Sequence, residues 1–323
     1  MRRAFVRTLV DLAKDDERIV LMTGDLGYTV VEPFAERFPK RFFNVGVAVQ
    51  NLLGLATGLA ESGFIPFVYS MTTFVVLRAY EFIRNGPIAH GLPVRIVGIG
   101  GGFEYASAGF THFGVDDVGV MRVQPGLTII APADHEQAAA ALRATWNREG
   151  PIYYRLGKDD VNTVPGLNGR FETTRAQALA EGRDLLILAM GAIARHADEA
   201  VKQLAARGHS VGLIIVDTVS PPPVAQLRQA LASVPVAMTV EAHYLVGGLG
   251  SLVSEIVAEH GLRCRVARCG VATMPVGRTG SEAYMAARHG LSTEGLVLSA
   301  LRALNGPAAL DGAQAGEAGH HGL

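Results

Sequence analysis

Short apolar segments alternate with segments of helical periodicity along most of the chain, and this alternation constrains the fold more than any other feature. The first set of apolar segments, each predicted to be a strand, covers residues 17–27, 42–48, 65–70, 92–102, 127–134 and 151–157. The helices predicted before and between them cover residues 4–14, 50–63, 73–90, 116–122 and 135–150. Strands that alternate with helices in this way favour a parallel sheet covered on both faces.

A second block of the same kind follows a more polar stretch. Its apolar segments cover residues 184–191, 209–219, 236–244 and 263–271, with helices predicted at 194–207, 224–232 and 250–260. At 323 residues the chain has room for two domains of about 150 residues each. We therefore expect an α/β fold of two parallel-type sandwich domains, at 1–160 and 184–304, joined by a linker at 161–183. The Ala- and Gly-rich end, 305–323, has no periodicity and is predicted to be disordered.

The composition excludes several classes of partner. Lys and Arg total 29 against 30 Asp and Glu, a formal charge of −1, and no block of like charge suggests nucleic acid or an anionic membrane. No apolar run reaches the roughly 18 residues of a membrane helix, and charged residues interrupt the N-terminus before a signal-peptide core could form. Cys264 and Cys269 complete no zinc pattern and indicate no oxidising compartment. We expect a soluble, cytoplasmic protein.

Three segments in the first block carry motifs. They are FFNVGVAVQNLLGLATGLAESG (42–63), IPFVYSMTTFVVLRAYEFIRN (65–85) and GFTHFGVDDVGVMRVQPGLTIIAPAD (109–134). In this order and spacing they resemble the pyrimidine-binding domain of transketolases. The first is similar to the family pattern Asn-Val-Gly-(Ile/Val)-Ala-Glu-Gln-Asn, the second to the strand and helix that hold the aminopyrimidine, and the third to the Thr-His-Gln segment that faces substrate.

The second block carries two further motifs. VEAHYLVGGLGSLVSEI (240–256) and RHGLSTEGLV (288–297) resemble segments of transketolase C-terminal domains. The family also has a pyrophosphate domain, whose Gly-Asp-Gly motif and following Asn hold Mg²⁺ and the diphosphate. No Gly-Asp-Gly motif occurs in this chain. The resemblance therefore implies that a separate N-terminal subunit supplies that site, as in split transketolases and alpha/beta 2-oxo-acid dehydrogenases.

The cofactor that the resemblance implies is thiamine diphosphate, which carries the difficult chemistry itself. In nearly all of the family a glutamate shares a proton with the pyrimidine ring and so activates it, and the matching position here is Val49. Valine cannot share a proton, and such groups typically contribute about 10²–10⁴-fold. Glyoxylate carboligases are active with valine at the corresponding place. The sequence thus leaves open an enzyme with unusual activation, an artificial substitution, or a pseudo-enzyme.

Further residues are expected to contact the cofactor because they match family positions. Phe74 lies where transketolases place an aromatic ring against the aminopyrimidine, although it could also be an ordinary core residue. Tyr69 and Met71 lie on the same approach, and Leu77 falls where some relatives have another aromatic ring. Gln50 also matches the family and either contacts the cofactor or holds the loop and a subunit contact.

Four positions are expected to face the substrate. His112 matches the family histidine that hydrogen-bonds the substrate, and an imidazole near neutral pKa can both donate and accept. The family aspartate that contacts a ketose hydroxyl falls on Ala108, which favours a less polar or differently shaped acceptor site. Arg155 matches the arginine that binds substrate phosphate, with a structural role at a strand end as the alternative. Asp25 matches a loop position that approaches substrate or the symmetry mate.

The sequence is thus interpreted as the beta subunit of a thiamine-diphosphate-dependent, transketolase-like enzyme that transfers a two-carbon ketol or short acyl unit. An α2β2 assembly with the N-terminal subunit is expected, with Mg²⁺ bound mainly by that partner and a ketose or 2-oxo acid as substrate. A carboligase or 2-oxo-acid-using relative, and a non-catalytic subunit that keeps only the assembly surface, remain the alternatives.

Overall fold

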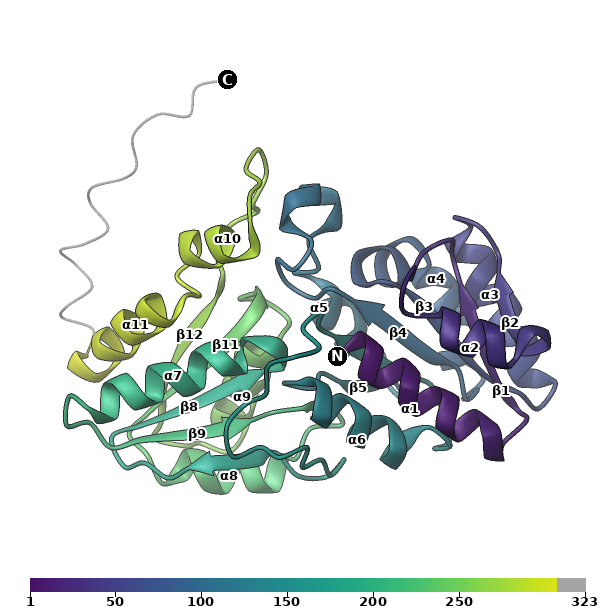
Figure 1. Cartoon of the computed structure of the whole chain (residues 1–323). Helices are drawn as coiled ribbons and strands as arrows, with labels where there is room; N and C mark the ends of the chain where they lie inside the picture. Colours follow the sequence, from purple (N-terminus) through teal and green to yellow (C-terminus); the bar gives the residue numbers. More distant parts are fainter. Residues whose placement is uncertain (307–323) are drawn as a thin grey trace.

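The computed structural model describes residues 1–306, so nearly all of the predicted tail lies outside the described residues. The chain forms two α/β lobes that lie side by side, each built around one sheet (Figure 1). This agrees with the expected fold class of two α/β domains. The longest described helix, α1 (Arg2–Asp15), has 14 residues, and none in this part of the chain combines the length and apolar character needed to cross a bilayer.

The first lobe has a seven-stranded sheet in the order β10-β5-β6-β4-β3-β1-β2. Its strands are β1 (Ile19–Thr23), β2 (Phe42–Asn44), β3 (Ile65–Met71), β4 (Arg95–Ile99), β5 (Thr128–Ile130), β6 (Ile152–Leu156) and β10 (Thr218–Ser220). Side chains of α1, α2 (Glu32–Arg37) and α6 (His135–Thr145) pack on one face. Those of α3 (Val49–Glu61), α4 (Tyr80–Ile83) and α5 (Asp117–Arg122) pack on the other.

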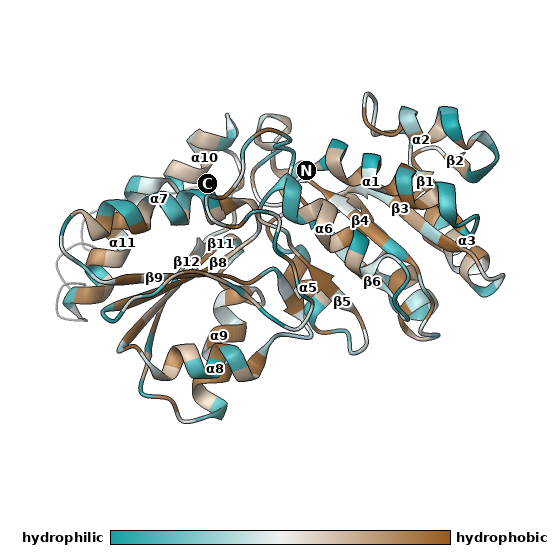
Figure 2. Ribbon diagram, turned by 60° about the horizontal axis from the view of Figure 1, so that its bottom comes forward, coloured by the Kyte–Doolittle hydropathy of each residue, from teal (hydrophilic) through white to brown (hydrophobic). Residues whose placement is uncertain are grey.

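The second lobe has a five-stranded sheet in the order β12-β11-β8-β9-β7. Its strands are β7 (Gln177–Ala180), β8 (Leu185–Met190), β9 (Val211–Ile215), β11 (Val236–Tyr244) and β12 (Arg265–Val271). Helices α7 (Ala194–Ala205), α10 (Glu282–Arg288) and α11 (Thr293–Asn305) cover one face. Helices α8 (Val224–Ala232) and α9 (Leu249–Glu259) cover the other. Figure 2 shows the result: apolar strands inside, and polar residues on the outer sides of the helices.

Two strands depart from the expectation of separate parallel sheets. Strand β7 lies within the stretch 161–183 that was predicted to be linker, and it pairs antiparallel with β9. Strand β10 belongs to the second block of sequence but pairs antiparallel with β5, at the edge of the first sheet. The two lobes therefore share backbone hydrogen bonds, which a simple succession of two domains would not provide.

The helix predicted over residues 73–90 is broken. It consists of a π-helical turn at Phe74–Arg78, the short α4, and a second π-helical turn at Arg84–Ile88 that contains Pro87. Proline lacks the N–H that a continuous α-helix needs, and π-turns absorb the resulting irregularity. The first turn follows β3 directly and carries Phe74, which is half-buried.

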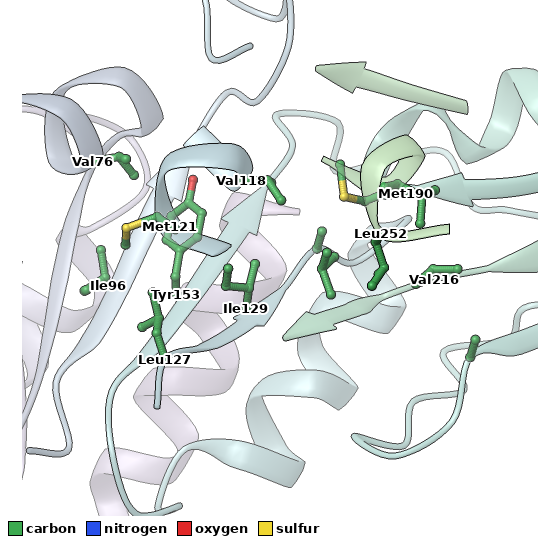
Figure 3. Packing of buried hydrophobic residues seen from close by; sticks show 14 of the residues in the cluster. Val76, Ile96, Val118, Met121, Leu127, Ile129, Tyr153, Met190, Val216 and Leu252 are labelled. Carbon is green, nitrogen blue, oxygen red and sulfur yellow. The ribbon is translucent and has the colours of Figure 1, made fainter. Parts of the chain in front are cut away.

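The hydrophobic core is continuous between the lobes. Figure 3 shows Val76 and Ile96 of the first lobe in the same cluster as Met190, Val216 and Leu252 of the second. Burial of apolar side chains is the main favourable term in folding, so a shared cluster couples the stability of the two lobes.

Candidate functional site

A recess of about 430 Å³ opens on the first lobe beside the π-helical turn that follows β3. Two segments supply its apolar lining: Phe74 and Leu77, here called the first wall, and Phe110, Phe113 and Val115, here called the second wall. The remaining lining residues are polar: Thr73, Arg78, Thr111 and Asp116. An apolar, aromatic hollow with a few polar groups is the usual form of a small-molecule site.

Phe74, which lines the recess, contacts His112 from a distant part of the sequence. Their ring centroids lie 5.1 Å apart at an interplanar angle of 72°, an edge-to-face contact. Thr111 Oγ1 lies 3.0 Å from His112 Nδ1, and within the described residues Nε2 of His112 makes no hydrogen bond. The Arg78 guanidinium lies 5.0 Å from the Phe74 centroid. The recess thus combines a half-buried aromatic ring with an imidazole nitrogen that is free for a ligand.

Asp116 supplies the carboxyl group of the recess lining. Its Oδ1 is buried and has no hydrogen-bond partner in the part of the chain that the structure describes. Burial, followed by repulsion from Asp117, raises the pKa of Asp116 above its ordinary value. A carboxyl group with a raised pKa and an unpaired oxygen can share a proton with a bound polar ring.

Comparisons with known proteins agree with this geometry. The model for the transketolase pyrimidine-binding domain matches residues 1–163, and that for the transketolase C-terminal domain matches residues 174–296. The chain is 34% identical over 304 residues to the 6-deoxy-6-sulfo-D-fructose transketolase subunit SqwH of Clostridium sp. strain MSTE9, with 93% of each chain covered. It is 32% identical over 303 residues to a subunit of the apulose-4-phosphate transketolase of Phocaeicola vulgatus, with 93% and 96% covered.

The chain belongs to the transketolase family. Among solved structures it is similar to a split-gene transketolase described as an inactive beta4 tetramer, at 33% identity and a TM-score of 0.84, with 94% and 97% of the chains covered. A transketolase from Leishmania mexicana shares the fold at 19% identity and a TM-score of 0.79, over 94% of this chain and 45% of its own. The chain is thus a C-terminal, beta-type member of the split transketolases.

Transketolases depend on thiamine diphosphate, and the recess fits the ring of that cofactor. Phe74, Phe110 and Phe113 provide apolar faces and edges for a flat heteroaromatic ring. The unpaired Oδ1 of Asp116 provides a polar atom in the same lining. Among residues 1–306, no group of three or more His, Cys, Asp or Glu side chains is arranged to hold a metal ion.

At the position of the usual transketolase glutamate, Val49 begins α3 and is 2% exposed. It packs in an apolar cluster with Met22 and Leu52. Gln50 is exposed on the next position of α3 and is not part of the recess lining. Val49 therefore packs in the core and offers no group that could share a proton. A cofactor contact by Gln50 stays a prediction.

The expectation for Tyr69 is wrong. Its side chain is 1% exposed and packs with the cluster under α1 and α2, on the face of the sheet away from Phe74. Successive side chains of a strand point to opposite faces, and Val68 is the residue of β3 that joins the cluster against which Phe74 packs. Met71 ends β3 half-buried and outside the recess lining, whereas Leu77, 41% exposed, lines the recess. Cofactor contacts by Met71 and Leu77 stay predictions.

Arg155 is held inside the protein. Its Nε donates to Asp117 Oδ2 at 2.8 Å, and Nη2 donates to the carbonyls of Gly114 and Ala242 at 2.8 and 3.0 Å. Tyr153 donates to the same Asp117 oxygen at 2.7 Å. Among the described residues, only Nη1 of the guanidinium has no hydrogen-bond partner. Substrate binding by Arg155 stays a prediction, and it would have to use Nη1.

The two other predicted substrate positions lie outside the recess lining. Asp25 has a positive φ of 58° and is exposed, and its backbone N–H donates to Asn44 Oδ1 at 3.0 Å. Asn44 Nδ2 in turn donates to Asp25 Oδ1 at 3.0 Å. Ala108 ends a short 3-10 helix and is exposed. Roles in substrate recognition for both residues stay predictions.

A second hollow, which the sequence did not suggest, lies between the lobes. This cavity of about 280 Å³ is lined by residues of both lobes, among them Glu104, Arg155, His196 and Glu282. Burial, with repulsion from Glu282, raises the pKa of Glu104 to about 8. No motif marks Glu104, because its surroundings form only when the lobes dock.

The motif at 240–256 is structural. Glu241 accepts the backbone N–H groups of Leu249 and Gly250, both at 2.7 Å, and so caps the start of α9. His243 Nδ1 donates to the Tyr244 carbonyl at 2.8 Å, and its Nε2 accepts from the Gly119 N–H at 3.1 Å. The motif thereby joins the second lobe to α5, the helix that follows the recess wall.

Proposed function

We propose that the chain is the beta subunit of a thiamine-diphosphate-dependent transketolase, and that the recess beside Phe74 receives the aminopyrimidine ring of the cofactor. An N-terminal subunit provides the magnesium and diphosphate site in an α2β2 assembly. The observation that carries the proposal is an aromatic recess lined by Phe74 and Leu77, with His112 in edge-to-face contact with Phe74. Support for the assembly comes from relatives that are named as transketolase subunits.

The residues of this chain have distinct roles in the proposal. Phe74 and Leu77 hold one side of the ring and exclude water. His112 Nε2 hydrogen-bonds the hydroxyl or carbonyl of the substrate. Asp116, whose pKa is raised by burial, shares a proton with the ring in place of the missing glutamate, because its Oδ1 has no hydrogen-bond partner among the described residues. When bound, the cofactor supplies the carbon nucleophile.

The substrate is a ketose or a 2-oxo acid that gives up a two-carbon ketol or short acyl unit. Ala108 replaces the family aspartate, so one hydroxyl contact of ordinary sugar phosphates is missing. The relatives are named for 6-deoxy-6-sulfo-D-fructose and apulose 4-phosphate, both sugars with an anionic group. We therefore propose that this subunit also acts on a sugar other than the common pentose phosphates.

Reconstitution tests this function. The chain, an N-terminal transketolase subunit, thiamine diphosphate and Mg²⁺ are mixed and assayed against a panel of ketose and 2-oxo-acid donors with aldose acceptors. Turnover that requires all four components is expected. Formation of a complex that turns over no donor would favour the non-catalytic alternative. Full turnover by this chain alone would contradict the division of the site between two subunits.

A further inference from the structure

The two walls of the recess are anchored in different hydrophobic clusters. Phe74 packs against the cluster that contains Val75 and Val76 of its own lobe. The second wall includes Phe113 and Val115, which are buried in the cluster of the second lobe together with Met285. The position of this second wall therefore depends on the C-terminal lobe, although its residues belong to the first block of sequence.

A stack of rings connects that lobe to the recess. The imidazole of His289, directly after α10, lies parallel to the ring of Phe103, with centroids 5.1 Å apart and 17° between the planes. Phe103 meets Phe113 edge to face at 5.2 Å and 84°. Phe113 lines the recess, and its neighbour His112 meets Phe74 at 5.1 Å. Ring contacts thus connect His289 to Phe113, and the backbone connects Phe113 to His112.

Hydrogen bonds from the same lobe also hold the segment that carries His112 and Phe113. Thr279 Oγ1 donates to the carbonyl of Ala106. The backbone N–H of Tyr244 donates to the carbonyl of Val115 at 2.6 Å. These bonds attach the segment to the second lobe before His112 and after Phe113.

We propose that His289 is a positioning residue, which holds Phe113 and His112 at the recess through its stack on Phe103. The consequence for catalysis rests on the proposed function, whereas the positioning itself does not. Within residues 1–306, His289 Nε2 is buried without a hydrogen-bond partner, so the ring acts through its flat face and not through a polar contact. Burial also lowers the pKa of His289, which favours the neutral form of the ring.

The imidazole signals of the chain report the positioning directly. The Cε1–H resonance of His112 lies in the ring current of Phe74 and is assigned by its loss in His112→Gln. We expect His289→Ala to shift this resonance and His289→Phe, which keeps a stacked ring, to restore it. Phe103→Leu removes the stack from the other side, with similar volume, and is expected to shift it as well.

His196→Ala is the matched control, because His196 is a half-buried histidine of the same lobe that bonds Thr293 Oγ1 at 3.0 Å and does not belong to the stack. It should leave the His112 resonance in place. A His112 resonance that is unmoved in folded His289→Ala, or in Phe103→Leu should His289→Ala fail to fold, overturns the proposal. An equal shift in His196→Ala overturns it too.

In the assembled enzyme the same variants separate positioning from folding. His289→Ala is expected to weaken the apparent affinity for substrate by about two- to tenfold, the equilibrium equivalent of one aromatic pair. His289→Phe is expected to recover it. An assembled enzyme that lacks turnover altogether contradicts the proposed function and leaves the resonance test intact.

Discussion

The recess and the cavity between the lobes differ in how far their polar groups are already used. In the recess, His112 Nε2 and Asp116 Oδ1 have no partner among the described residues. In the cavity, three of the five N–H groups of Arg155 bond within the protein. Free polar atoms beside aromatic rings suit a ligand, whereas paired charges stabilise a fold. We therefore propose that the chemistry takes place at the recess, and that the charges between the lobes are structural.

Breaking the buried ion pair should have the largest effect on stability. Asp117→Ala leaves the Arg155 guanidinium buried without its charge partner, which typically costs about 3–5 kcal/mol. Urea unfolding measures this loss. Asp11→Ala removes a carboxylate whose ion pairs are exposed and should change stability by less than about 1 kcal/mol. If both substitutions lowered the free energy of unfolding by the same small amount, the ion pair with Asp117 would not hold Arg155 in the fold. The guanidinium would then be available for ligands.

Restoring the family carboxylate tests whether the pyrimidine ring lies near the start of α3. In the assembled enzyme, Val49→Glu is expected to speed proton exchange at the thiazolium carbon by about 10²-fold, or about 2.7 kcal/mol. It should also lower the stability of the chain, because Val49 is buried among apolar side chains. Val49→Gln, which is polar but cannot ionise, is the control. An unchanged exchange rate would indicate that the pyrimidine ring does not lie near α3.

Glu104 should make stability depend on pH. Its folded pKa of about 8 lies above the ordinary 4.5, so the fold favours the neutral carboxyl. The stability that the neutral Glu104 carboxyl contributes is fully present below about pH 4.5 and is lost as the pH rises through 8. Glu104→Gln should remove the dependence and be more stable at pH 8 by on the order of 4 kcal/mol. Parallel stability curves for the two proteins between pH 5 and about 8 would refute a buried, neutral Glu104.

Loss of the recess ring should have the smallest effect. Phe74→Ala is expected to raise the apparent KM for thiamine diphosphate about two- to tenfold, because an aromatic contact is lost. Phe82→Ala removes a similar ring from α4, outside the recess lining, and should leave that KM unchanged. If Phe82→Ala raised the KM for thiamine diphosphate more than Phe74→Ala did, the cofactor would not bind at the recess.

The sequence predicted most of the strands and helices of both lobes because their apolar periodicity is local, but not β7, α2 or α10. Phe74 and Leu77, which it named as cofactor contacts, both line the recess, and the contact with a cofactor stays a prediction. It did not predict which face of β3 carries Tyr69, since a motif match does not fix the parity of side chains along a strand. The pairing of β10 with β5 and the surroundings of Glu104 depend on docking of the lobes, and no local pattern encodes that contact.

The structure of the assembled complex with thiamine diphosphate and Mg²⁺ tests the central claim most directly. We predict that the aminopyrimidine ring lies against Phe74, within reach of His112 and Asp116, while residues of the N-terminal subunit hold the diphosphate and the metal ion. A recess filled by side chains of the N-terminal subunit, with the cofactor bound elsewhere, would contradict the account.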